Sequence, residues 1–351
     1  MRKKLYLLAA IDLLFIMVTF FTCWKISLAL IILSLLTGIC GLSFLVLNKL
    51  FKKTNYWKNL FDFQKRFVSN EGYRDNISRN YDIINLGSNP AMFAFFYEQV
   101  RGQNWSTGSQ GLSMDFEILK YFHSYLRDGG IVLIPIMPFT AISQYLKNKP
   151  EYWSDNYYMK FASILDGYQA NHLNGAKNYL LMLKCPLLYN IKGIKYLFHD
   201  VERDHRLEIA EQPMQALDME QDARLCIQSW MKEFDVTDME AFYSDKFAEY
   251  YEEGTQILRD MINYCLERNY KPVIITIPMT SYLGEMFNEE FRQKMVKDFV
   301  SKANEKDVLF LDYWNQRVFT DSSLYFNSFY FNLRGRKLFT AQVLKELGLM
   351  S

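Results

Sequence analysis

The stretch YDIINLGSNPA, residues 81–91, decides the fold of the soluble part of the chain. Its apolar beginning, Tyr81–Leu86, is typical of a buried strand, and Gly87 with Ser88 predicts a turn. Pro90 suits the first turn of a helix, which we expect to continue through AMFAFFYEQV. A strand, a Gly-Ser turn and a helix bring the Ser88 hydroxyl to the carboxyl edge of a sheet, where open α/β sheets bind ligands. Serine is also a common helix N-cap, so a purely structural role for Ser88 stays open.

The rest of the soluble chain alternates strands with helices, which predicts an α/β domain with a parallel sheet over residues 55–351. Further strands are expected at 131–136, 273–277 and 308–311, with a short extended piece at 103–106. Helices are expected at 115–127, 245–269, 288–303 and 334–347. No comparable strand pattern occurs in residues 141–244, which we interpret as a mostly helical insertion.

Residues 1–54 are predicted to be a membrane anchor. The runs LYLLAAIDLLFIMVTFFTCW (5–24) and ISLALIILSLLTGICGLSFLVL (26–47) are each about as long as the ~20 residues that span a bilayer. One helix over both runs would be about 64 Å long, twice the ~30 Å hydrocarbon core, so we favour a transmembrane hairpin with helices at about 5–24 and 26–48 over one long tilted helix. The lipid bilayer is then a partner of this chain.

Basic residues flank the two runs, and by the positive-inside rule they place both ends of the hairpin and the large domain in the cytoplasm. The flanking cations are Arg2, Lys3 and Lys4 before the first run and Lys49, Lys52, Lys53 and Lys58 after the second. The turn between the runs carries only Lys25.

Composition excludes several classes of function. The 40 Lys and Arg against 39 Asp and Glu give a net charge of +1, which does not favour a nucleic-acid partner. The 5 cysteines are scattered without a CxxC pair, so neither a zinc site nor a disulfide framework is expected. Without a Walker loop or GxGxxG, no nucleotide cofactor is implied, and we expect no cofactor.

Five motifs, taken in order, resemble the SGNH/GDSL hydrolase superfamily, in particular membrane-anchored bacterial members related to the D-alanyl transfer protein of teichoic acid synthesis and to proteins that accompany membrane-bound O-acyltransferases. The motifs are NLGSNPA (85–91), NWSTGSQGLSMDFEILKYF (104–122), GGIVLIPI (129–136), KPVIITIP (271–278) and LDYWNQRVFTDSSLYFNSFYFNLRGRKLFT (311–340). The resemblance implies a flavodoxin-like three-layer sandwich and an extracellular large domain, in conflict with the charge rule.

The resemblance also implies roles for residues of the carboxyl edge. It places the nucleophile on Ser88 and the glycine of the oxyanion hole on Gly108 or Gly111. Asn104 and Gln110 are nearby polar candidates for substrate binding.

The last motif departs from the family pattern DxxHLNxxG. Asn332 and Gly335 fit, but Tyr330 stands at the position of the histidine and Asn327 at that of the aspartate. Met137–Thr140 occupies the place where the family has a further asparagine. A tyrosine, with a pKa near 10, is a poor base at neutral pH, and an asparagine has no carboxylate to orient an imidazole.

These replacements predict a catalytically degenerate site. We therefore expect an accessory or binding subunit of cell-envelope polysaccharide or teichoic acid modification, whose partner is a membrane-bound O-acyltransferase or a polysaccharide assembly protein. The alternative is an active serine esterase or O-acyltransferase that uses Ser88 with an unconventional base.

Four histidines could supply that base, and none has the family spacing. His123 follows the second motif, and His172 lies in NHLNG within the insertion. His199 and His205 belong to a charged stretch, FHDVERDH, that is typical of a solvated surface and matches no standard metal site.

Overall fold

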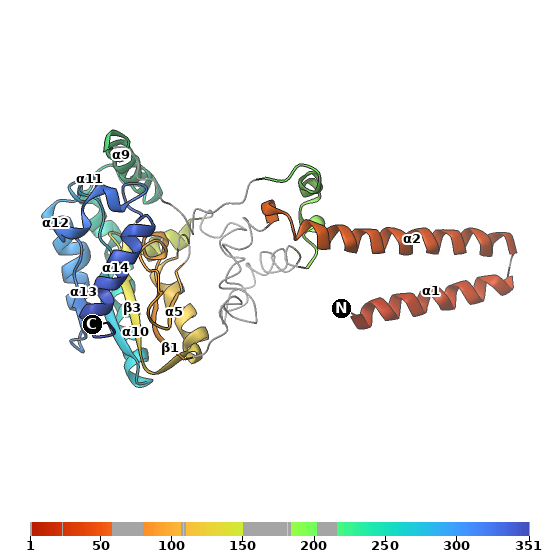
Figure 1. The fold of residues 1–351 in the computed structure, drawn as a ribbon, viewed down its shortest axis with the longest axis horizontal. Coiled ribbons are helices and arrows are strands. Elements are labelled where there is room, and N and C mark those ends of the chain that lie inside the picture. The colour runs from red at the N-terminus through yellow and green to blue at the C-terminus, as the bar shows by residue number, and fades with distance from the viewer. Residues whose placement is uncertain are drawn as a thin grey trace. The chain divides into compact units, whose positions relative to one another are not determined.

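The computed structural model describes residues 2–22, 24–57, 80–106, 108, 110–149, 181, 184–201 and 216–350. The chain divides into two compact units (Figure 1). One unit comprises Met1–Asn59 together with Leu180–Arg203, and the other comprises Leu60–Tyr179 together with Asp204–Ser351. The segment around residue 190, which the sequence placed in the insertion of the α/β domain, thus belongs with the N-terminal helices.

The larger unit is an α/β fold with a parallel sheet, which confirms this part of the prediction. Five strands are hydrogen-bonded in the order β2-β1-β3-β4-β5, and every pairing is parallel. The strands are β1 (Tyr81–Asn85), β2 (Gly102–Asn104), β3 (Leu126–Ile136), β4 (Lys271–Thr276) and β5 (Phe310–Leu311). The central strands β1, β3 and β4 are almost entirely buried, as expected for a parallel sheet covered on both faces.

Helices follow the strands near the predicted positions. The main ones are α5 (Leu112–Phe122), α10 (Ala248–Glu267) and α14 (Leu333–Glu346). The predicted helix at 288–303 consists of α12 (Glu289–Arg292), a π-helical stretch (Gln293–Asp298) and α13 (Phe299–Ala303). Within the predicted insertion, the longest described elements of the α/β unit are the 3₁₀ helix η2 (Thr140–Asn148) and α9 (Ala216–Glu233), and the described parts of the insertion contain no strand.

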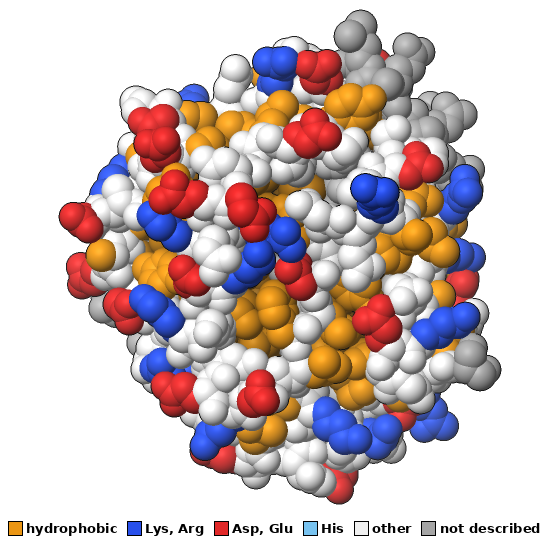
Figure 2. Space-filling view, turned by 90° about the vertical axis from the view of Figure 1, so that its left-hand side faces the viewer, with side chains coloured by type: hydrophobic (Ala, Val, Ile, Leu, Met, Phe, Trp, Pro, Cys, Tyr) orange, Lys and Arg blue, Asp and Glu red, His pale blue; other side chains and the backbone are white. Residues whose placement is uncertain are grey.

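The helical surface of the α/β unit carries exposed ion pairs. On α12 and the π-helical stretch, Lys297 Nζ lies 2.9 Å from Glu289 Oε1 and Lys294 Nζ lies 2.7 Å from Glu290 Oε1. Figure 2 shows acidic and basic side chains interspersed across the visible face of the molecule. Exposed pairs of this kind contribute little to stability, about 0–1 kcal/mol each.

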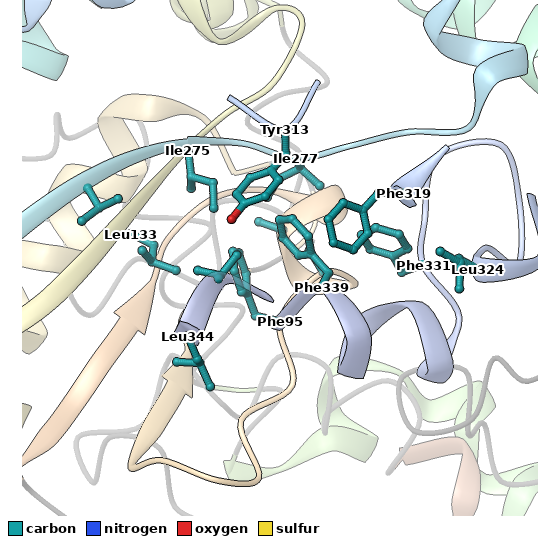
Figure 3. Packing of buried hydrophobic residues seen from close by; sticks show 14 of the residues in the cluster. Phe95, Leu133, Ile275, Ile277, Tyr313, Phe319, Leu324, Phe331, Phe339 and Leu344 are labelled. Atoms are coloured by element: carbon teal, nitrogen blue, oxygen red, sulfur yellow. The ribbon is translucent and has the colours of Figure 1, made fainter. Parts of the chain in front are cut away.

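One hydrophobic cluster joins α14 to the sheet (Figure 3). The Phe339 ring of α14 is fully buried, with ring centroids 5.1 Å from Tyr313, 5.2 Å from Phe319 and 5.5 Å from Phe95. Alternate residues of β3 and β4, such as Leu133 and Ile275, belong to the same cluster. The loop that carries Tyr330 leads directly into α14. The packing of Phe339 therefore fixes the helix at the end of this loop.

The helix after Ser88 is much shorter than predicted. The sequence predicted a helix through residue 100, but α4 ends at Met92 (Asn89–Met92). The carbonyls at its end and just beyond it bond to side chains from elsewhere. Asn104 Nδ2 donates to the carbonyls of Ala91, Met92 and Phe95, and Arg336 donates to those of Met92 and Phe95. These tertiary bonds satisfy the carbonyls without a continuing helix.

The N-terminal unit contains α1 (Arg2–Thr22), α2 (Trp24–Phe51), α8 (Pro186–Tyr189) and the 3₁₀ helix η5 (Ile191–Leu197). One described helical stretch, Leu30–Phe51, is long and apolar enough to cross a membrane. The shorter stretch Leu8–Val18 is apolar as well.

Candidate functional site

A pocket of about 210 Å³ lies at the carboxyl ends of β1 and β3. Its walls come from the turn after β1, the start of α5, the segment after β3, the end of α9 and the loop before α14. Ser88, Gln110, Gly111 and Tyr330, four of the residues predicted from the sequence, all line it. The carboxyl edge of the sheet is where ligand sites of open α/β sheets are found.

Ser88 occupies a tight turn directly after β1. Gly87 has φ of +109°, and a Cβ built there would lie 2.8 Å from the Ala91 Cβ, so the turn requires glycine. Ser88 is the N-cap residue of α4 by position, but its side chain makes no capping bond. The Ser88 hydroxyl has no hydrogen-bond partner among the described residues, in contrast to the purely structural role left open by the sequence.

Tyr330 lines the same pocket and is partly buried. Its side chain is hydrogen-bonded to Asn89, and its ring stacks on Phe93 with centroids 5.1 Å apart. Burial raises the pKa of Tyr330 to about 12, and the bond to Asn89 offsets this in part. At neutral pH this phenol keeps its proton, so it can donate a hydrogen bond to a ligand but cannot act as a base.

Asn327 is outside the pocket lining and shapes the loop that carries Tyr330. Its Oδ1 accepts hydrogen bonds from the backbone N–H of Phe329 (3.0 Å) and of Tyr330 (2.7 Å). The same loop is tied to α9, because Asp222 accepts bonds from the backbone N–H (2.8 Å) and the hydroxyl (2.5 Å) of Ser328. Asn327 is thereby an Asx-turn residue of the loop.

Asp115 is a pocket residue that sequence reasoning missed. It is only 3% exposed, and its Oδ1 accepts a hydrogen bond from the Gly87 N–H (2.8 Å) and one from Gln110 Nε2. Desolvation raises its pKa to about 7, although both hydrogen bonds act in the opposite direction. Asp115 therefore binds the Gly87–Ser88 turn through the Gly87 N–H, and its carboxyl changes protonation state near neutral pH.

A signal for Asp115 was present in the sequence. Leu112, Leu119 and Phe122 lie three, four and seven residues from it, which is the spacing of one helix face, and all three are buried. An aspartate at a core position of an amphipathic helix is unusual, because buried carboxylates are rare unless they are paired. Such a residue is a candidate for a functional site.

Gln110 brings an unsatisfied acceptor to the pocket. The residue is 5% exposed, and its Nε2 donates to Asp115, while its Oε1 is buried without a partner. Leaving such a buried acceptor unpaired costs about 1–3 kcal/mol. Because this oxygen has almost no accessible surface, a ligand donor would pair with it only after the Gln110 side chain turns toward the pocket. Glu233, at the end of α9, also lines the pocket; the residue is exposed overall, but desolvation raises its pKa.

Three other predicted site residues, Asn104, Asn332 and Gly108, do not line the pocket. Asn104 binds the carbonyls at the end of α4, as described above. Asn332 is the N-cap of α14: its Oδ1 accepts from the Gly335 N–H (3.0 Å), and its Nδ2 donates to the carbonyl of Ser323 (2.8 Å). Gly108 is buried and does not line the pocket, whereas Gly111 does, as the N-cap residue of α5.

None of the described histidines lies in the pocket. His123 lies just before β3, at the amino end of the strands, where its Nδ1 is 3.2 Å from the Tyr270 hydroxyl. His199 belongs to the N-terminal unit, and His172 and His205 lie outside the described residues. Among the described residues, no group of three or more His, Cys, Asp or Glu side chains is arranged to hold a metal ion.

Comparison with known proteins identifies no relative. No protein-family model matches the chain, and no curated protein matches its sequence. The resemblance to the SGNH superfamily therefore rests on the motifs alone and stays a prediction.

Proposed function

We propose that this chain is a membrane-anchored, SGNH-like α/β protein that binds a ligand in the Ser88 pocket without hydrolysing it. The observation that carries this proposal is the composition of the pocket, in which Ser88 and Tyr330 are lining residues and no described histidine is. We further propose that it acts in cell-envelope polysaccharide or teichoic acid modification, as an accessory subunit of a membrane-bound O-acyltransferase or a polysaccharide assembly protein, because its motifs resemble those of such proteins.

The chemistry of the pocket argues against rapid catalysis through Ser88. A serine hydroxyl needs a neighbouring base to remove its proton, and the Ser88 hydroxyl contacts none through a hydrogen bond within the described residues. Tyr330, with a pKa of about 12, holds its proton at neutral pH. Lack of a general base lowers the rate by about 10²–10⁴-fold.

The same pocket suits a small ligand that donates hydrogen bonds. Its described lining contains two carboxyl groups, Asp115 and Glu233, and no lysine, arginine or histidine. The buried Gln110 Oε1 needs a donor, and the rings of Phe139, Trp230 and Phe329 form apolar walls. The volume is below the ~300–1,000 Å³ of sites for drug-sized ligands, which favours a group the size of one sugar ring. A neutral sugar matches these features better than an anion.

The anchor in this proposal is a transmembrane hairpin formed by α1 and α2. The two helices contact each other, and the stretch Leu30–Phe51 has the length and apolarity of a membrane span. In the sequence, lysines and arginines lie at both outer ends and only Lys25 at the turn, which supports a cytoplasmic α/β domain. Protease protection of that domain in spheroplasts tests the orientation.

Two assays on the full chain in detergent test the proposed function. The unmodified protein and Ser88→Ala should show the same background hydrolysis of p-nitrophenyl acetate, whereas Asn327→Asp combined with Tyr330→His should add hydrolysis that Ser88→Ala removes. Calorimetric titration should detect N-acetylglucosamine but not glucose 6-phosphate, and Gln110→Leu should weaken the former. Turnover by the unmodified protein that disappears in Ser88→Ala would contradict the proposal.

A second candidate function is an active esterase or O-acyltransferase, and one observation favours it. The Asp115 carboxyl lies under the Ser88 turn with a pKa of about 7, close to the value of an efficient general base. In that case Asp115→Asn should abolish turnover that also depends on Ser88. If the chain only binds its ligand, neither the unmodified protein nor Asp115→Asn turns over substrate.

A further inference from the structure

A segment distant in sequence is fastened to the last turn of α2. In this segment, residues 184–201, the Leu187 N–H donates to Asn48 Oδ1 (3.0 Å) and the Tyr196 ring stacks on Tyr56 with centroids 3.8 Å apart. The Asp200 carboxylate accepts the backbone N–H groups of Asn55 (2.6 Å) and Tyr56 (3.0 Å). These bonds hold the segment at Phe51, where the candidate membrane span ends.

The segment exposes large apolar side chains that the α2 contacts do not cover. Phe198 is 76% exposed, and Leu188 and Ile191 are each 59% exposed. Ile194 and Val201 are partly exposed as well. Isolated apolar residues on a surface are normal, but several within a short segment indicate an interaction site.

Charge around these side chains is strongly positive. Six lysines lie in residues 48–57 and 184–201, namely Lys49, Lys52, Lys53, Lys184, Lys192 and Lys195. The one acidic residue in these ranges is Asp200, whose two carboxylate oxygens accept the backbone bonds described above. The mixed-sign surface of the α/β unit in Figure 2 has no such excess of one sign on the face shown.

We propose that residues 184–201 form a second membrane contact, an interfacial collar that inserts its apolar side chains between anionic lipid headgroups. This inference rests on the proposed membrane anchoring. A segment fixed at the end of a membrane span is held at the height of the headgroups, so the bilayer is the nearest apolar phase for Phe198 and Ile191. Lysines beside apolar side chains are the composition of interfacial segments that bind anionic lipid.

Fluorescent labels on single cysteines test the collar in the full chain. The five native cysteines are replaced by serine, and one cysteine at a time is introduced by Phe198→Cys, Ile191→Cys, Leu42→Cys or Val318→Cys. The labelled protein is reconstituted in vesicles with or without phosphatidylserine. Quenching by brominated lipids reports contact with the bilayer, and quenching by iodide reports contact with water.

The controls separate failure of the collar from failure of the anchor. Leu42 lies within the candidate span, and Val318 is a 64% exposed apolar residue of the α/β unit. We expect brominated lipids to quench labels at Leu42, Phe198 and Ile191 and iodide to quench the label at Val318. Lipid quenching at Leu42 alone would overturn the collar and keep the anchor. Absence of lipid quenching at all four positions would overturn the anchor.

The lysines predict a dependence on lipid charge. Lipid quenching at position 198 should be stronger in vesicles that contain phosphatidylserine, and Lys192→Glu with Lys195→Glu should remove this difference. A label at 198 that neither iodide nor brominated lipid quenches would show that protein covers the site, and this result would also overturn the proposal.

Discussion

Replacement of Asp115 by asparagine should change how stability depends on pH. Asparagine keeps an oxygen for the Gly87 N–H and for Gln110 but cannot ionise. In the folded chain the pKa of Asp115 is raised from 3.8 to about 7, a shift of about 3 units, and each unit is worth about 1.4 kcal/mol. The carboxyl is 3% exposed, so solvent screening reduces this shift little. The full effect at high pH is therefore about 4 kcal/mol.

The sign follows from the direction of the shift. Because the folded-state pKa lies above the unfolded-state value, the protonated carboxyl stabilises the fold. This stabilisation is fully present below about pH 4 and is lost as the pH rises through 7. More than half of the loss falls between pH 5 and pH 8. Asp115→Asn should not show it, so the variant gains stability relative to the unmodified chain across this range.

Urea unfolding of the full chain in detergent, followed by tryptophan fluorescence at pH 5 to 8, measures the effect. Asp245→Asn, at an exposed aspartate, is the matched control and should follow the unmodified protein. Parallel curves for Asp115→Asn and the unmodified chain would refute the reasoning, because they would mean that Asp115 ionises freely in the folded state.

Three further predictions test the packing, capping and burial of the α/β unit. Gly335→Ala places a Cβ 2.2 Å from the Leu324 carbonyl oxygen and should lower the free energy of unfolding by about 1–3 kcal/mol in urea titrations, whereas an unchanged midpoint would contradict this packing. Asn332→Ala removes the cap of α14 and should cost about 2 kcal/mol, while Asn332→Asp keeps the capping oxygen and should lose less. Cys265 is fully buried and desolvation raises its pKa to about 12, so maleimide should modify it only after unfolding, and rapid native labelling would contradict its burial.

The strands and most helices could be predicted because their pattern is local. The apolar run at 131–136 lies within β3, and the amphipathic run at 245–269 contains α10. The early end of α4 could not be predicted, because the partners of its carbonyls are Asn104 and Arg336, the latter more than 240 residues away in the chain. Local propensity is overridden here by tertiary hydrogen bonds.

The site was predictable in part for the same reason. The Gly-Ser turn and the tyrosine at the position of the family histidine are visible in short motifs. Ser88 and Tyr330 both line the pocket. The role of Asp115 depends on its bond to Gly87, which lies 28 residues earlier and approaches it only in the folded sheet. The attachment of residues 184–201 to α2 likewise depends on contacts such as that between Asn48 and Leu187, 139 residues apart.

Reaction of the full chain with a fluorophosphonate probe measures directly whether a base activates Ser88. These probes phosphonylate serines whose hydroxyl is deprotonated by a neighbouring group. Mass spectrometry of the peptide that contains Ser88 should find it unmodified at neutral pH in the unmodified protein. Stoichiometric phosphonylation of Ser88, absent in Ser88→Ala, would show an activated nucleophile and contradict a pocket that only binds.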